Sequence, residues 1–171
     1  MKTLTLFALV CVMMALTGAA AVPEDKANKD QTAVRRYYRV GCSGGWSSFN
    51  GRCFLYIPSP MTWAKAEKNC ESMGANLASV HNILEYQELQ RLIKANSHED
   101  KVTWIGGTDA QEEKKWLWSD GTPFNFSTWC GGEPNNLGGR QNCLQINVGA
   151  QKCWDDMQCD SQRPSVCARK P

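Results

Sequence analysis

Five oxygen-bearing side chains in the C-terminal third of the chain are of the types that hold a hard cation. They are Glu133, Asn135, Gln141, Asp155 and Asp156. The first three lie in the segment CGGEPNNLGGRQNC (residues 130–143), which is rich in glycine and in amide side chains. Calcium takes about six to eight oxygen ligands, several of them carboxylates. This composition suits a loop whose oxygens gather around calcium, and it also suits a polar loop that is only exposed to solvent.

Other chemistries have fewer suitable residues. Zinc sites use histidine and cysteine, but neither His81 nor His98 stands at a zinc-like spacing from a cysteine pair. A serine or cysteine nucleophile needs a base beside it, and no nucleophile motif accompanies either histidine. The formal net charge of +2, with no basic cluster longer than Arg35-Arg36, argues against nucleic acid as a partner. We therefore predict a binding protein and not an enzyme.

The N-terminal residues indicate secretion. A basic start is followed by an apolar run from Leu4 to Leu16 and by small residues, which is the pattern of a signal peptide. A membrane anchor is the alternative, but the run is shorter than the ~20 apolar residues of a span. The predicted parts are a signal peptide (1–21), a flexible leader or propeptide (22–41) and the folded domain (42–169). We expect a secreted, extracellular protein without a membrane span.

Cysteine usage supports an oxidising compartment. Cys11 leaves with the signal peptide. The remaining cysteines are Cys42, Cys53, Cys70, Cys130, Cys143, Cys153, Cys159 and Cys167. An even number in a secreted chain indicates a disulfide framework. Their spacing alone does not choose among the ~105 possible pairings.

One strand signal is followed by two helical signals and then by many further strand signals along the folded part. Thr62 is a suitable N-cap for one helix, and Asn82 with Glu85 forms a capping box for a second. Pro58 and Pro60 are expected to end the first strand. The expected elements are helices over 62–73 and from 82 onward, and strands at 54–57, 103–105, 116–118, 144–147, 152–154 and 165–167. Helices segregated from strands indicate an α+β fold.

Several short motifs occur in an order that resembles C-type lectin-like domains. They are MTWAKAEKNC, GANLASV, WIGG, WSDGTPFNFSTW, GEPN, CWDD and SVC. The resemblance covers nearly all of residues 42–168, and within the family the chain is most similar to secreted fish lectins and the related type II antifreeze proteins. It implies two helices flanking small antiparallel sheets, with a long loop region that binds Ca²⁺.

The resemblance also implies how the cysteines pair. The implied disulfides are Cys42–Cys53, Cys70–Cys167, Cys130–Cys153 and Cys143–Cys159. The Cys130–Cys153 bridge is a feature of the subgroup of fish lectins and antifreeze proteins. Several of the antifreeze proteins have a fifth bridge at positions that match Ala110 and Asn142, and this chain lacks those cysteines.

The resemblance assigns calcium to all five oxygen-bearing residues and sugar to four of them, Glu133, Asn135, Gln141 and Asp155. It implies a cis peptide bond between Glu133 and Pro134. The Glu-Pro-Asn order resembles the mannose-type selector, which favours equatorial vicinal hydroxyls, as in mannose, fucose or N-acetylglucosamine. Gln141 stands where a glutamate is usual and Asp155 where an asparagine is usual. The two changes cancel in charge, so three carboxylates remain and calcium binding is expected.

The predicted function is that of a secreted calcium-dependent lectin that recognises surface glycans in innate immunity. One weak sugar site needs an oligomer or clustering for useful avidity. The alternatives are a type II antifreeze protein that binds ice on the same fold, a lectin-like venom or haemostatic factor, and a lectin-like domain that has lost its ligand. Asn125-Phe126-Ser127 is a glycosylation sequon, so Asn125 is a candidate attachment site.

Overall fold

The structure, a computed structural model, describes residues 41–171, and the predicted signal peptide and nearly all of the leader lie outside this part. Its helices are α2 (Trp63–Glu71) and α3 (Ile83–Ser97), with a short 3₁₀ helix η1 (Leu137–Gly139). Its strands are β1 (Ser47–Phe49), β2 (Arg52–Met61), β3 (Asn76–Leu77), β4 (Thr103–Thr108), β5 (Leu117–Trp118), β6 (Gln141–Val148), β7 (Cys153–Gln158) and β8 (Arg163–Arg169). Neither helix is long and apolar enough to cross a membrane.

Both helices begin at the N-caps that the sequence predicts. The Thr62 hydroxyl accepts a hydrogen bond from the backbone N–H of Lys65 at 3.4 Å, and the Asn82 side chain accepts one from Glu85 at 3.0 Å. These bonds satisfy N–H groups that have no partner inside a helix. Gly74, just beyond α2, has φ +67°, a conformation that glycine adopts without steric cost. The chain can therefore turn there into β3.

The strands form one sheet with the order β1-β2-β8-β4-β6-β7, while β3 pairs with β8 and β5 with β4. All pairings are antiparallel except that of β4 with β8, which meet in parallel at Trp104 and Ser165. This single pair joins two antiparallel regions, β1-β2-β8 and β4-β6-β7. The fold is therefore α+β as predicted, with the expected small sheets connected edge to edge.

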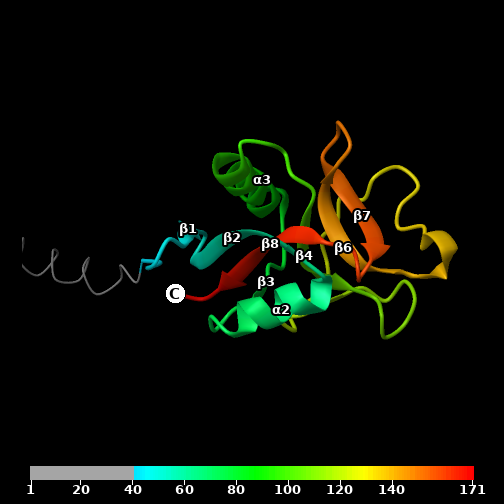
Figure 1. The fold of residues 1–171 in the computed structure, drawn as a ribbon, viewed down its shortest axis with the longest axis horizontal. Coiled ribbons are helices and arrows are strands. Elements are labelled where there is room, and N and C mark those ends of the chain that lie inside the picture. The colour runs from blue at the N-terminus through cyan, green and yellow to red at the C-terminus, as the bar shows by residue number, and fades with distance from the viewer. Residues whose placement is uncertain (1–40) are drawn as a thin grey trace, which may run out of the picture. The chain divides into compact units, whose positions relative to one another are not determined.

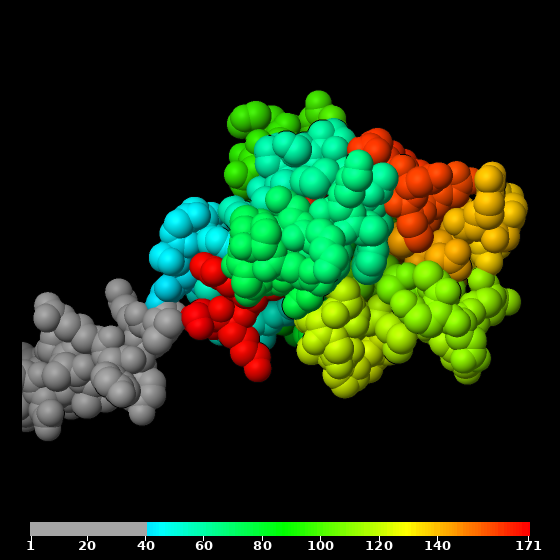
Figure 2. Space-filling model, turned by 60° about the horizontal axis from the view of Figure 1, so that its bottom comes forward, coloured from blue at the N-terminus to red at the C-terminus, as the bar shows by residue number. Residues whose placement is uncertain are grey.

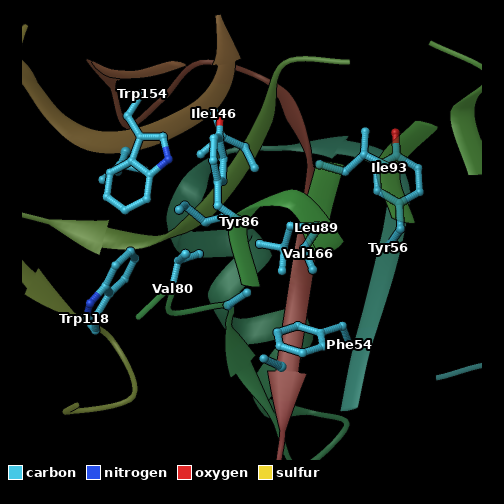
Figure 3. Packing of buried hydrophobic residues seen from close by; sticks show 14 residues of the cluster. Phe54, Tyr56, Val80, Tyr86, Leu89, Ile93, Trp118, Ile146, Trp154 and Val166 are labelled. Atoms are coloured by element: carbon cyan, nitrogen blue, oxygen red, sulfur yellow. The ribbon is translucent and has the colours of Figure 1, made fainter. Parts of the chain in front are cut away.

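The two helices cover different sides of the β2–β8 region, while β6 and β7 extend away from it (Figure 1). Leu89 and Ile93 of α3 are fully buried and belong to the same apolar cluster as Val166 of β8 (Figure 3). Trp154 of β7 is also fully buried and meets Trp118 edge to face at 5.8 Å between ring centroids. This core therefore reaches from α3 to the strand that carries Asp155 and Asp156.

The observed strands are mostly longer than the predicted ones, and β1 and β3 were not predicted. The end of β2 also contradicts the expectation that its prolines stop the strand. Strand β2 continues through Pro58 and Pro60 to Met61, although proline cannot donate a backbone hydrogen bond. Its register against β8 is irregular between Ile57 and Met61, and the intervening residues are exposed. The prolines therefore occupy a stretch where no ladder hydrogen bond is lost, and the strand resumes its pairing after them.

Four disulfides tie these elements together, in the same pairs that the resemblance implies. They are Cys42–Cys53, Cys70–Cys167, Cys130–Cys153 and Cys143–Cys159. The bridge with the largest sequence separation, 97 residues, joins α2 to β8. The last two of the four connect the segment around residues 130–143 to β7 and to the turn after it.

Candidate functional site

Three of the predicted ligands come together at one edge of the domain. One carboxylate oxygen each from Glu133, Asp155 and Asp156 can be chosen so that all three lie within 4.8 Å of one another. Glu133 belongs to the loop before β6, and the two aspartates belong to β7. Figure 2 shows the segment around residue 140 beside β7 at the surface of the molecule. Ionised carboxylates at this separation repel one another. A divalent cation bound between them would offset that repulsion and accept their oxygens as ligands.

Asp156 holds the loop through hydrogen bonds to its backbone. Its side chain is 1% exposed, and its two oxygens accept hydrogen bonds from the backbone N–H groups of Asn135 (3.1 Å) and Asn136 (2.7 Å). The chain reaches this position through a cis peptide bond between Glu133 and Pro134. A buried carboxylate whose two oxygens each accept a backbone N–H is held in one orientation. Asp156 therefore supplies both a charge and the anchor for the turn.

The start of the loop is fixed to β7 by the backbone. The N–H of Cys130 donates to the carbonyl of Trp154 at 2.8 Å, and the N–H of Trp154 donates to the carbonyl of Thr128 at 2.9 Å. Trp154 itself packs in the aromatic core. Trp154 therefore holds the start of the loop by two backbone hydrogen bonds, and Asp155 and Asp156 follow it directly in β7. This places the loop that carries Glu133 next to the two aspartates.

Glu133 and Asn135 lie side by side. The Asn135 side chain donates to Glu133 Oε1 at 2.8 Å, and the Asn135 backbone N–H donates to Oε2 at 3.0 Å. The pKa of Glu133 is raised to about 7, chiefly by loss of hydration and then by a hydrogen bond with Asp156 and by the charges of Asp155 and Asp156. Ionisation of Glu133 beside the two aspartates is therefore unfavourable when no cation is bound.

Asp155 is half-buried and has a side-chain partner that the sequence did not indicate. Its Oδ2 accepts a hydrogen bond from the Gln145 amide at 2.7 Å. Burial raises the pKa of Asp155, and the Asp156 charge adds to this rise, while the Gln145 hydrogen bond opposes it. Gln145 lies opposite Asp155 in the β6–β7 ladder, so only the strand register could have pointed to it.

Gln141 is placed differently from the other four predicted ligands. It is buried, its Oε1 accepts the backbone N–H of Leu137 at 2.5 Å, and its amide nitrogen lies 3.9 Å from the Met157 sulfur. Within residues 41–171 its side chain makes no hydrogen bond to the three acids. The structure thus gathers Glu133, Asn135 and the two aspartates and leaves the Gln141 amide engaged with the loop.

The remaining sequence features fall outside this cluster. Asn125 of the sequon is exposed, so its side chain is accessible. Most of the tryptophans pack in the apolar core. Trp104, Trp118 and Trp154 are buried, and Trp116 and Trp129 are partly buried against the same core.

Sequence similarity to known proteins places the chain in a family. Residues 59–169 match the Lectin C-type domain, which is well over half of the chain. The protein belongs to the C-type lectin domain family. The chain is 38% identical over 180 residues to ladderlectin of Oncorhynchus mykiss, covering 99% of the chain and 95% of the relative. It is 39% identical over 151 residues to lactose-binding lectin l-2 of Anguilla japonica, covering 86% of the chain and 89% of the relative.

The fold of this chain has close counterparts among solved structures. The herring type II antifreeze protein superposes with a TM-score of 0.71 at 39% sequence identity, covering 76% of this chain and 99% of that structure. The relatives therefore include both lectins and antifreeze proteins.

Proposed function

We propose that this protein is a secreted, calcium-dependent lectin that binds glycans on microbial or host surfaces. The convergence of Glu133, Asp155 and Asp156 within 4.8 Å is the observation that carries the proposal. Asn135, and Gln141 after a change of side-chain partner, would complete the set that holds the ion. Bound calcium supplies two positive charges and coordination positions for a pair of sugar hydroxyls.

The acid cluster fits a divalent cation. None of the ion pairs within residues 41–171 involves Glu133, Asp155 or Asp156. Their negative charge is therefore not balanced by a neighbouring salt bridge, and the raised pKa of Glu133 reflects partly buried, crowded carboxylates. A cation relieves this repulsion, whereas a site that had lost its ligand would be expected to lose the acids as well.

Sugar recognition follows from donor and acceptor types. A sugar hydroxyl can donate one hydrogen bond and accept another, and an ionised carboxylate only accepts while an amide nitrogen only donates. Glu133 Oε1 and Asn135 Nδ2 lie 2.8 Å apart, so an acceptor and a donor stand together for one hydroxyl. Asp155 would accept from the neighbouring hydroxyl. Gln141 would donate to that hydroxyl once its amide turns from Met157.

The first experiment is affinity chromatography on immobilised mannose. We expect retention of the mature protein in calcium and release by a chelator. A parallel lactose resin tests the galactose class, which the name of the eel relative raises. Retention on lactose alone would keep the calcium-dependent lectin and overturn the mannose assignment. Flow-through from both resins, and from resins bearing fucose and N-acetylglucosamine, would overturn the lectin proposal.

A double substitution tests the selector directly. Glu133→Gln with Asn135→Asp exchanges acceptor and donor around the first hydroxyl while keeping one carboxylate, so the charge available to calcium is unchanged. We expect this variant to lose retention on mannose and to gain it on galactose, because the reversed order no longer matches equatorial vicinal hydroxyls. Unchanged mannose retention would show that these two residues do not select the sugar. Calcium titration of both proteins is the control.

An antifreeze role is the second candidate, favoured by the 39% identity to the herring antifreeze protein over 76% of the chain. Leu137, at the tip of the loop, is 71% exposed, which provides some apolar surface there. Ice binding would appear as thermal hysteresis in a dilute solution of the protein. Hysteresis without retention on any sugar resin would favour the antifreeze function, and its absence would exclude it.

A further inference from the structure

Gln145 is enclosed between strands at the base of the acid cluster. It is 3% exposed, and its backbone pairs with Trp104 of β4 on one side and Asp155 of β7 on the other. A residue paired on both sides in a sheet has little freedom to shift. Its side chain is therefore presented from a rigid position.

Both ends of the Gln145 amide are occupied. The nitrogen donates to Asp155 Oδ2 at 2.7 Å, and the oxygen accepts from Arg163 Nε at 3.0 Å. An arginine only donates and an ionised aspartate only accepts. The reversed orientation of the amide would set donor against donor and acceptor against acceptor. The two charged neighbours thus dictate one orientation of Gln145.

We propose that Gln145, oriented by Arg163, is a positioning residue that aims Asp155 at the bound calcium and the sugar. By holding Oδ2, it fixes the rotation of the carboxylate and leaves Oδ1 for the cluster with Glu133 and Asp156. The proposal rests on the calcium-dependent lectin function proposed above and extends it to residues outside the ligand set. It also gives a reason for aspartate at position 155, where the family usually has asparagine. An asparagine would have to give Gln145 its only carbonyl oxygen and turn its NH₂ group towards the cluster, whereas aspartate keeps a second oxygen for the cluster.

The decisive variant is Gln145→Met, which keeps the length and volume of the side chain and removes both hydrogen bonds. Partners that orient a metal ligand typically change metal affinity by about 10- to 100-fold. We expect the calcium dissociation constant, measured by isothermal titration calorimetry, to rise about tenfold. The matched control is Gln90→Met on α3, which also loses a side-chain hydrogen bond, to the carbonyl of Lys152 at 3.2 Å. That control is expected to change thermal stability but not calcium affinity.

A double-mutant cycle separates positioning from general stability. If Gln145 acts through Asp155, Gln145→Met has little further effect on calcium affinity in an Asp155→Ala background. An equal weakening in both backgrounds would overturn the proposal, and so would an unchanged affinity in Gln145→Met alone.

The calcium-free protein provides an independent readout. The Gln145 side-chain NH₂ should give a shifted NMR signal with slow solvent exchange, and this signal should move towards that of a free amide in Asp155→Ala. If the unmutated protein shows no such shifted, slowly exchanging signal, the hydrogen bond between Gln145 and Asp155 is not formed and the proposal fails. A wild-type protein that fails to bind calcium would overturn the lectin function together with this role. A wild-type protein that binds calcium as tightly as Gln145→Met would overturn only the role of Gln145.

Discussion

Replacing Asp156 with asparagine is expected to weaken calcium binding by roughly 100-fold, since ligand charge tunes calcium affinity over several orders of magnitude. Asp156 is the most buried of the three acids, and it also holds the N–H groups of Asn135 and Asn136. The substitution removes one of three negative charges and leaves one acceptor oxygen where the turn uses two. Loss of calcium affinity should abolish sugar retention as well. Calorimetric titration with calcium measures the first effect, and the mannose resin measures the second.

The matched control for this substitution is Asp160→Asn. Asp160 is exposed in the turn after β7, so this variant changes the net charge by the same amount without touching the cluster. Its calcium affinity should stay within about twofold of the unmutated protein, as expected for a surface charge. Near-ultraviolet circular dichroism establishes that the Asp156→Asn variant is folded. A folded Asp156→Asn protein that retains full calcium affinity would rule out this site as the calcium centre.

Calcium binding is expected to depend steeply on pH because of Glu133. Folding raises the pKa of this carboxyl from 4.5 to about 7 in the calcium-free protein. The folded state therefore holds the proton more tightly than the unfolded state, so the stabilisation from this proton is complete below pH 4.5. It is lost as the pH rises through about 7, where Glu133 ionises. Bound calcium should reverse this loss, because it favours the ionised carboxylate.

Two measurements follow from that linkage. Below pH 7 calcium competes with the proton on Glu133, so its affinity should fall by up to about tenfold per pH unit, or roughly 100-fold at pH 5. The melting temperature of the calcium-free protein should decrease from about pH 5 to pH 8, whereas calcium should raise it most at the upper end.

Glu133→Gln isolates the contribution of this residue. The variant cannot ionise at position 133, so much of the pH dependence of the calcium-free melting temperature should disappear. Asp155, whose pKa is also raised by burial, should leave a smaller residual slope. If Glu133→Gln shows the same pH profile as the unmutated protein, the crowding of carboxylates does not govern stability.

Local features of the fold could be predicted because they depend on neighbours in the sequence. Thr62 and Asn82 cap their helices through N–H groups three residues away, a contact that composition and spacing reveal. The alternation of short β-rich runs likewise indicated the strands. The extension of β2 past Pro58 could not be predicted, because it depends on an irregular register against β8, more than one hundred residues further along the chain.

In the candidate site, too, some features could be predicted from the sequence and others depended on the tertiary structure. The residue types at Glu133, Asn135, Asp155 and Asp156 predict a calcium site through their oxygen ligands and their resemblance to the C-type lectin pattern. The side-chain orientation of Gln141 was not predictable, because its amide has two competing uses. It can face an ion, or it can bond Leu137 and lie against Met157, as in this structure.

The partner of Asp155 was decided by tertiary structure alone. Val148 pairs with Cys153 near the β6–β7 turn, and an uninterrupted register from there would place Gln145 opposite Asp156. A shift between Gln145 and Val148 places it opposite Asp155 instead. The sequence by itself determined which oxygens are available and roughly where the strands lie. The bulge decided which of them meet, because a shift of one residue moves side chains to new partners across the ladder, and its position depends on packing against strands distant in the chain.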